Sequence, residues 1–295
     1  MTEPGRHPSI ANALELAAEH LQRAGVLNAR REATALWAAL AGVRPGDVWL
    51  SRDGEPDAPL ADRFWAAVER RASGVPFPYV VGTVAFRTLQ LGCDPRALIP
   101  RPETEGLVAL VLEWAKGDGG GRQGGIAADI GTGTGCIALA LAVEGPFERV
   151  IAVERSPEAA ALARENVALV RPPVPVEVRE GELLGPLAGA RYRAIVSNPP
   201  YVTAAEYDAL DPAVREHEPR GALLSGADGL ATTRALFAGA AALLVPGGVL
   251  ALEIDERRGE AVRALAHEHG WARIGIHDDL FGRPRYALAF PKEVA

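Results

Sequence analysis

The chain has 295 residues, of which 48% are hydrophobic and 23% charged, an ordinary composition for a globular protein with enough core for one large or two smaller domains. Its net charge of −7 argues against a strongly basic surface that binds nucleic acid. Apolar stretches fall short of the roughly 20 residues that span a bilayer, and the first residues, MTEPGRHPSI, lack the layout of a signal peptide, so we expect a soluble, cytoplasmic protein.

Apolar side chains at helical spacing between residues 9 and 72 predict a small helical bundle. Ser9 is a suitable N-cap for a first helix that stops near Gly25. A second helix should cover Ala29 to Leu40 and a third Leu60 to Ala72. Nothing in this bundle indicates catalysis.

Residues 75 to 100 change to strand-like patterns. The run PYVVGTVAFRTLQLGCD is interrupted by Gly82 and Gly92, which predicts a β-hairpin. Further on, Gly117 to Gly125 (GDGGGRQGG) has the composition of a flexible connection.

From residue 101 onwards, helical and strand patterns alternate. The predicted helices cover 103–115, 136–143, 157–167, 230–243 and 256–269, and the predicted strands cover 126–130, 150–153, 174–178, 194–196, 248–254 and two segments near Ile274 and Ala287. This alternation predicts an α/β fold, Rossmann-like, with a mostly parallel, doubly wound sheet covered by helices on both faces. Ligands of such sheets bind beyond the carboxyl ends of the strands.

The two cysteines, Cys93 and Cys136, lie far apart and form no zinc or disulfide pattern. We expect both to be small buried or half-buried residues, and we expect no metal site.

The first predicted strand of the second region ends in a glycine-rich loop, Asp129 to Gly135 (DIGTGTG). Such loops let a ligand approach the backbone and offer it the N-terminus of the next helix. The third glycine of the dinucleotide fingerprint would fall at position 136, where this chain has Cys136, which makes pyrophosphate binding less favourable. A tight turn without a ligand is the alternative.

The second predicted strand ends at Glu154. An acidic residue about 20 positions after the glycines is where these folds hold ribose hydroxyls, and a carboxylate can accept hydrogen bonds from both. Alternatively, Glu154 could pair with an arginine on the surface. Combined with the glycine loop, its position favours a bound nucleoside over a dinucleotide.

The third strand end carries the motif SNPPY, Ser197 to Tyr201. Its prolines have no N–H to donate, so the strand pairing must stop there. If the nucleoside is S-adenosylmethionine, the Asn198 side-chain oxygen and the Pro199 carbonyl could hold both hydrogens of a planar –NH2 group, and Tyr201 could pack against it. They would aim the nitrogen lone pair at the methyl group and stabilise its developing positive charge. A plain turn is again the alternative.

These motifs and the stretch ALIPRPETEGLV resemble the HemK/PrmC protein-(glutamine-N5) methyltransferases. The resemblance continues through RRASGVPFPYVVG, HEPRGALLSGADGL and DDLFGRPRYALA and covers nearly the whole chain. NPPY alone is shared with adenine-N6 DNA methyltransferases, whereas IPRPETE, EPR…DGL and the terminal D-L-x-G-R-x-R are specific. The resemblance implies transfer of a methyl group from S-adenosyl-L-methionine to the side-chain amide nitrogen of the GGQ glutamine in peptide-chain release factors.

The resemblance also implies roles for individual residues. The glycine loop would line the methionine part of the cofactor, Glu154 would hold the ribose, and Leu183 would contact the adenine where the family usually has an aromatic residue. Asn198 to Tyr201 would cradle the glutamine, with Asn198 also near the cofactor, and Arg101 to Glu105 would form the other wall. The cofactor set is Gly131, Thr132, Gly133, Thr134, Gly135, Glu154, Leu183 and Asn198; the substrate set is Arg101, Asn198, Pro199, Pro200 and Tyr201, of which Asn198, Pro199 and Tyr201 would be catalytic.

A second departure from the family lies at Glu253-Ile254-Asp255 and Arg257, where the family has E-I-G and a nearby Gln. For the domains we expect a substrate-recognition domain over 1–74, a hairpin linker over 75–100 and the methyltransferase domain over 101–295. The release factors would be protein partners, with no membrane and no direct nucleic-acid contact.

Other functions stay open at this point. A glutamine methyltransferase of a ribosomal protein shares NPPY and differs mainly in its N-terminal domain. An adenine-N6 methyltransferase should have a basic target-recognition region, which this composition does not supply. A non-catalytic adaptor could keep the fold, although the intact motifs argue against it.

Overall fold

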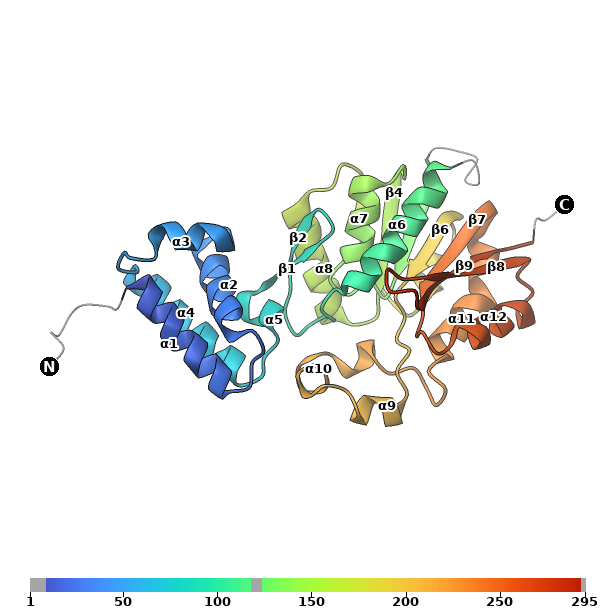
Figure 1. The fold of residues 1–295 in the computed structure, drawn as a ribbon. Coiled ribbons are helices and arrows are strands. Elements are labelled where there is room, and N and C mark those ends of the chain that lie inside the picture. Colours follow the sequence, from blue (N-terminus) through green and yellow to red (C-terminus); the bar gives the residue numbers. More distant parts are fainter. Residues whose placement is uncertain (1–8, 118–123, 293–295) are drawn as a thin grey trace, which may run out of the picture. The chain divides into compact units, whose positions relative to one another are not determined.

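The computed structural model describes residues 9–117 and 124–292, which form two compact units (Figure 1). The first unit contains the described residues up to Gly82 together with Pro212–His217, and the second contains Thr83–Asp211 and the described residues from Glu218 on. The expectations for the first eight residues and for most of GDGGGRQGG lie outside the described residues. Within these ranges, no helix is long and apolar enough to cross a membrane.

The first unit is helical, as predicted. Its elements are α1 (Ile10–Arg23), α2 (Ala29–Ala41), a 3-10 turn (Pro45–Asp47), α3 (Val48–Ser51), α4 (Ala58–Ala72), α5 (Phe77–Val81) and α10 (Pro212–His217). Ser9 caps α1 by accepting a hydrogen bond from the backbone N–H of Asn12. The core of α1, α2 and α4 includes Trp37 and Phe64, whose rings meet edge to face with centroids 5.0 Å apart.

The strand expected at the start of the hairpin is wrong for residues 77–81, which form α5. Val80 and Val81 favour strands, but Pro76 and Pro78 fix backbone angles suited to a helix start. Gly82, with φ +77°, then ends the helix. The hairpin itself is present and shorter, with β1 (Thr83–Phe86) paired antiparallel to β2 (Leu89–Gly92).

The second unit is built on a sheet that, in the described part of the chain, has seven strands in the order β5-β4-β3-β6-β7-β9-β8. The strands are β3 (Ile126–Ile130), β4 (Arg149–Glu154), β5 (Val176–Glu180), β6 (Tyr192–Ser197), β7 (Leu244–Glu253), β8 (Arg273–Asp278) and β9 (Pro284–Phe290). Pairing is parallel from β5 to β7 and antiparallel for β9 with both of its neighbours. The predicted Rossmann-like, mostly parallel sheet is thus confirmed.

The helices of this unit are α6 (Pro102–Lys116), α7 (Cys136–Glu144), α8 (Pro157–Val170), α9 (Ala204–Asp208), α11 (Ala231–Ala240) and α12 (Gly259–Glu268). The last one begins three residues later than predicted, at Gly259 rather than 256. Asp255 is the reason, because its carboxylate accepts the backbone N–H of Arg257 and holds a turn before the helix. The segment expected as a loop after Tyr201 also contains short helices, and the strand expected at 174–178 lies at 176–180.

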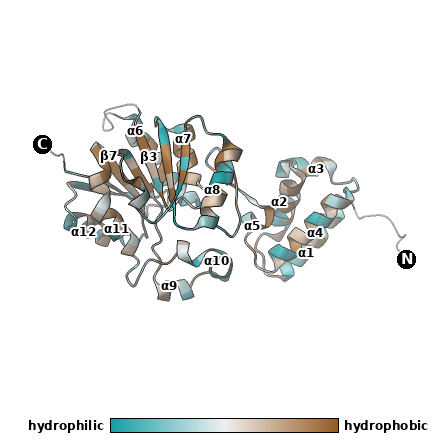
Figure 2. Ribbon diagram, turned by 180° about the vertical axis from the view of Figure 1, so that it is seen from behind, coloured by the Kyte–Doolittle hydropathy of each residue, from teal (hydrophilic) through white to brown (hydrophobic). Residues whose placement is uncertain are grey.

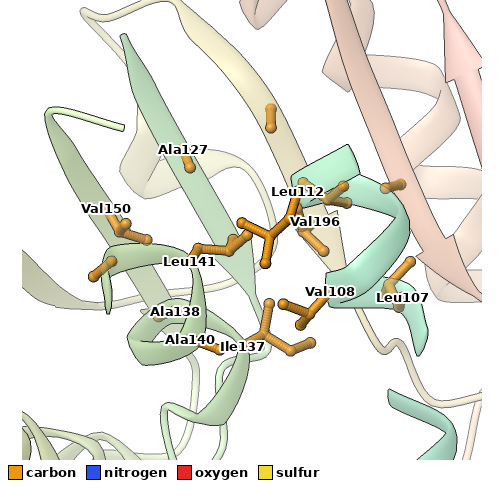
Figure 3. Packing of buried hydrophobic residues seen from close by; sticks show 14 of the residues in the cluster. Leu107, Val108, Leu112, Ala127, Ile137, Ala138, Ala140, Leu141, Val150 and Val196 are labelled. Atoms are coloured by element: carbon orange, nitrogen blue, oxygen red, sulfur yellow. The ribbon is translucent and has the colours of Figure 1, made fainter. Parts of the chain in front are cut away.

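Alternate residues of the strands enter two separate cores, one on each face of the sheet. Figure 3 shows Leu107, Val108 and Leu112 of α6 beside Ile137 and Leu141 of α7, over the strand residues Ala127 and Val196. On the other face, Leu236 and Phe237 of α11 and Val262 of α12 pack with strand residues such as Ile195 and Leu250. Strands buried on both faces are mostly apolar along their whole length, and Figure 2 shows β3 and β7 in brown along most of their length.

Helix α6 lies close to β9 at one glycine, Gly106. A Cβ at this position would meet the hydroxyl of Tyr286 and, at 2.7 Å, its ring carbon Cζ. Tyr286 is buried and its hydroxyl donates to the carbonyl of Glu103 at 2.7 Å, so the ring has little freedom to move. The first turn of α6 is therefore fixed against the sheet.

We predict that Gly106→Ala destabilises the protein, although alanine normally stabilises a helix interior by about 0.5–1 kcal/mol. Overpacking costs ~1–3 kcal/mol, so the free energy of unfolding should fall by about 1–2 kcal/mol in denaturant titrations. Gly259→Ala is the control, because its Cβ would have its nearest contact at 3.5 Å and should leave stability unchanged or higher. Equal stabilities of the two variants would contradict the prediction.

Candidate active site

A cavity of about 490 Å³ opens at the carboxyl ends of β3, β4, β5 and β6. This volume is typical of small-molecule sites, and its position is where open α/β sheets bind their ligands. The lining comes from the segments that follow these four strands, together with parts of the chain around Ala97, Pro219 and Ala231. From the predicted site it contains Gly131, Gly133, Glu154, Leu183, Asn198, Pro199 and Pro200.

Asp129, in β3, fixes the glycine loop that follows this strand through two hydrogen bonds. Its Oδ2 accepts the Thr132 hydroxyl at 2.5 Å and the backbone N–H of Ala138, in the first turn of α7, at 3.1 Å. The backbone at Gly131 and Gly133 has φ +72° and +54°, which glycine adopts without strain. A Cβ at Gly131 would meet nothing within 4 Å, so the chain leaves open space beside the cavity there. Thr132, Thr134 and Gly135 belong to the loop but not to the cavity lining.

Burial raises the pKa of Asp129 to about 7, which its two hydrogen bonds only partly oppose. Its Oδ1 has no hydrogen-bond partner among the described residues. Asp129 was not among the predicted site residues, although an acidic residue two positions before the first glycine was visible in the sequence.

Glu154 lies at the end of β4, and its carboxylate binds backbone rather than arginine. Oε2 accepts the N–H of Gly133 at 3.0 Å, and Oε1 accepts those of Arg155 and Ser156 at 2.8 and 2.9 Å. Each carboxylate oxygen has more than one lone pair, so a ligand in the cavity can donate to it as well. The side chain therefore fixes the glycine loop to β4 and faces the cavity.

Leu183 lines the cavity beyond β5, with φ +50°. This left-handed conformation is uncommon for a residue other than glycine, asparagine or aspartate. Gly181, two residues earlier, also has a positive φ, of 150°. The side chain packs against the core that contains Leu236 and Phe237, and it offers the cavity only apolar contact.

The NPPY segment leaves β6 beside the glycine loop. Ser197 donates its hydroxyl to the carbonyl of Ile130 at 2.7 Å, which joins the ends of β6 and β3. The side-chain amide of Asn198 donates to the Thr104 hydroxyl at 3.1 Å, and that hydroxyl donates to Glu253 Oε2 at 2.6 Å. Asn198 thus turns its amide nitrogen towards α6, which leaves its carbonyl oxygen available to a ligand.

Tyr201 is half-buried behind the prolines and does not line the cavity. Burial raises the pKa of its hydroxyl to about 12, so the ring is neutral at physiological pH. Arg101 also lies outside the lining, where its guanidinium pairs with the buried carboxylate of Glu218 at 2.5 Å. Glu218 in turn accepts the backbone N–H of Ile99. The pairing connects the IPRPETE stretch with the EPR stretch.

Both cysteines are buried, as predicted, and burial raises the pKa of each thiol to about 12. Among the described residues, no group of three or more His, Cys, Asp or Glu side chains is placed to hold a metal ion.

Comparison with known proteins identifies the family. Residues 12–82 match the model of the PrmC N-terminal domain, and residues 112–216 match that of the methyltransferase small domain. A release factor glutamine methyltransferase from Deinococcus radiodurans is 42% identical over 95% of this chain and 98% of its own length. The chain belongs to this methyltransferase family.

Other relatives carry the same name. Those from Moorella thermoacetica and Streptomyces coelicolor are 41% and 38% identical over 97% and 92% of this chain, and 99% and 95% of their own lengths. The family consists of S-adenosylmethionine-dependent enzymes, so the chain is a methyltransferase.

Solved structures show the same fold. A methyltransferase from Pyrococcus furiosus has a TM-score of 0.52 and 22% identity, and covers 70% of this chain and 90% of its own. A 16S rRNA methyltransferase from T. thermophilus, solved with AdoMet and guanosine, has a TM-score of 0.52 and 19% identity over 71% of this chain and 50% of its own. At these identities the likeness concerns the fold alone.

The buried Asp129 should make stability depend on pH. Because its pKa is raised from 3.8 to about 7, the folded state binds a proton that the unfolded state releases, and stability falls as pH rises between these values. Asp129→Asn has no such proton. We predict that the free energy of unfolding of the wild type, relative to Asp129→Asn, decreases from pH 4 to about pH 7 and is level above it.

Denaturant titrations of both proteins at several pH values measure this difference. Titrating groups that do not interact with Asp129 are shared by the two proteins and cancel. A difference that is constant across this pH range would contradict the raised pKa.

Proposed function

We propose that this protein transfers the methyl group of S-adenosyl-L-methionine to N5, the side-chain amide nitrogen, of the glutamine in the GGQ motif of peptide-chain release factors. The observation that carries the proposal is the orientation of Asn198, whose nitrogen is engaged by Thr104 while its oxygen remains for a substrate amide. The names of the relatives supply the release factor as substrate. The GGQ glutamine and the N5 position come from the resemblance of the motifs.

The cavity lining suits the proposed cofactor. Glu154 would accept hydrogen bonds from the ribose hydroxyls, and the open space at Gly131 would admit the methionine part close to the backbone. Leu183 would give the adenine apolar contact. When bound, S-adenosylmethionine supplies a methyl group on a positively charged sulfur.

The methyl acceptor in this proposal is an amide nitrogen, a poor nucleophile because its lone pair is conjugated. Asn198 Oδ1 and the Pro199 carbonyl would accept the two hydrogens of the –NH2 group. The ring of Pro199 locks its φ and the following Pro200 restricts its ψ, which together limit the direction of this carbonyl. Held this way, the lone pair points at the methyl group and the acceptors stabilise the positive charge that grows on nitrogen. Positioning of this kind can contribute several of the ~7–11 kcal/mol available from alignment of two reactants.

A side chain with a tuned pKa is not needed in this scheme, because the proton can leave after methyl transfer. The neutral Tyr201 ring would pack against the planar amide, and Arg101 would act on the substrate side of the site through its ion pair with Glu218.

The remaining expectations belong to the same proposal. Residues 1–74 would dock the release factor, residues 75–100 would link the domains, and residues 101–295 would carry the chemistry. The enzyme would work in the cytoplasm, where release factors act, without direct contact to nucleic acid.

The proposal is tested by offering the protein three acceptors with labelled S-adenosylmethionine: an unmethylated release factor, a ribosomal protein fraction and duplex DNA. We expect one methyl group on the release factor, which peptide mass spectrometry should locate on the GGQ glutamine. A release factor with that glutamine replaced by asparagine is the control acceptor and should stay unlabelled. Methyl on the ribosomal fraction or DNA instead would refute the proposed substrate.

We predict that Asn198→Ala lowers kcat by about 100- to 1000-fold, the usual effect of losing one preorganised polar contact in a transition state. Cofactor binding, measured by calorimetry, should remain close to the wild-type value. Glu154→Ala should show the opposite pattern and weaken cofactor binding, because it removes the carboxylate that lines the cavity. Wild-type turnover in Asn198→Ala would show that the amide cradle is not used.

A further inference from the structure

A chain of hydrogen bonds runs from Asn198 into the protein interior. Asn198 directly follows β6, Thr104 lies in the first turn of α6, and Glu253 ends β7, so three separate parts of the chain contribute to it. Thr104 is 2% exposed and Glu253 is 1% exposed. Burying a carboxyl group is costly unless its hydrogen bonds are made, and Glu253 makes its bond to Thr104 at 2.6 Å.

The direction of each hydrogen bond follows from counting donors. A threonine hydroxyl has one hydrogen, and next to a carboxylate, which can only accept, that hydrogen must point to Glu253. The hydroxyl then has only lone pairs left for Asn198, so Asn198 must present its NH2 group to Thr104. The two ends of an asparagine amide have almost the same shape, and this partner decides between them.

The orientation of the Asn198 amide determines which of its atoms faces the cavity. With its nitrogen held by Thr104, Asn198 directs its oxygen away from α6, and Asn198 lines the cavity. In the opposite orientation, the amide would present N–H groups to a substrate –NH2, and two donors would face each other. Loss of the carboxylate or of the hydroxyl would allow that unproductive orientation.

We propose that Thr104 and Glu253 are positioning residues for methyl transfer: the Glu253 carboxylate orients the Thr104 hydroxyl, which sets the side-chain amide of Asn198 with its oxygen towards the acceptor. This inference rests on the proposed function, because it concerns the orientation of the group that would hold the acceptor amide. Neither residue touches the reacting atoms in this scheme.

The charges around Glu253 determine when it is ionised. Burial is the largest effect and raises its pKa, the hydrogen bond from Thr104 lowers it, and among the nearby charges Arg285 and Arg101 lower it while Glu103 raises it, so that the pKa lies at about 7. Burial, and after it the charge of Glu253, raises the pKa of the Tyr201 and Tyr286 hydroxyls, so both stay neutral. Asp255 adds a further negative charge near Tyr201. Above neutral pH the ionised Glu253 therefore fixes the orientation of the Asn198 amide. Once Glu253 takes up a proton, this orientation is no longer fixed.

The test uses Thr104→Val, which keeps the shape and removes the hydroxyl, and Glu253→Gln, which keeps the size and removes the charge. With saturating cofactor and release factor, kcat should fall by about 10- to 100-fold in each, the usual effect of one hydrogen bond to a charged group. Cofactor affinity measured by calorimetry should not change. Thr104→Ser should restore most of the activity. Thr233→Val, which makes the same change at a buried threonine of α11, is the matched control.

The kcat of a double variant that includes Asn198→Ala distinguishes a positioning role of Thr104 from general damage to the fold. Once Asn198 is alanine, adding Thr104→Val should lower kcat less than twofold, because the group that it positions is gone. The wild-type kcat should fall below about pH 7, whereas that of Glu253→Gln should be level there. Additive effects in the double variant, wild-type kcat in either single variant, or the same pH profile in Glu253→Gln would each overturn the inference.

The outcomes also distinguish this inference from the proposed function. If the wild type methylates the release factor and the double variant is additive, the function stands and the positioning role fails. If the wild type labels no release factor, the proposed function itself fails. In that case the inference that rests on it fails with it.

Discussion

Parallel pairing of β3 with β6 is the constraint on which the rest of the site depends. The register sets Asp129 opposite Val196, so that both strands end at nearly the same level of the sheet. One end continues into the glycine loop and the other into NPPY, and the Ser197 hydroxyl joins them through the carbonyl of Ile130. This pairing joins segments 67 residues apart in the sequence, at Ser197 and Ile130, and would bring the proposed cofactor close to the proposed acceptor. A shift of one residue would turn the strand side chains to the opposite faces and destroy both cores.

The site is surrounded by buried carboxyl groups, and each is held in a different way. Glu154 accepts three backbone N–H groups, Glu218 pairs with Arg101, and Asp129 and Glu253 each accept a hydroxyl. Burial makes ionisation of a carboxyl group less favourable, and it raises the pKa values of Asp129 and Glu253 to about 7. In the proposed transfer from a positively charged sulfur to a nitrogen, those carboxyl groups that are ionised would favour the positive charge of the reacting groups.

Sequence patterns predicted the fold well where local preference and burial agree. Residues 126–130 form β3 as predicted, and both faces of the sheet are covered, as the mostly apolar strand sequences indicated. The prediction failed at residues 77–81, where valines suggested a strand but the two prolines and Gly82 define one helical turn. It also missed the late start of α12, since the turn held by Asp255 depends on a side-chain hydrogen bond that periodicity does not report.

In the candidate site, too, some features could be predicted from the sequence and others could not. Residues carried by loops with a recognisable composition, such as Gly131, Gly133 and Asn198, were predicted and line the cavity. Thr104, Glu218 and Glu253 were present in quoted motifs, but their partners could not be found from the sequence, because each pairs with a residue that is 94 or more positions away. These contacts depend on strand order, which is not sequential in this sheet.

The first turn of α6 explains why these distant motifs occur together in one chain. Arg101 before the helix pairs with Glu218, Thr104 binds both Asn198 and Glu253, and the Glu103 carbonyl accepts the hydroxyl of Tyr286. Gly106, one turn on, has no Cβ and so lets Tyr286 approach. The start of α6 thus contacts the segment that follows β6, the end of β7 and the strand β9. Because Thr104 lies in the same turn as the groups that bind Glu218 and Tyr286, we expect a change in these partners to affect Thr104 and, through it, the amide of Asn198.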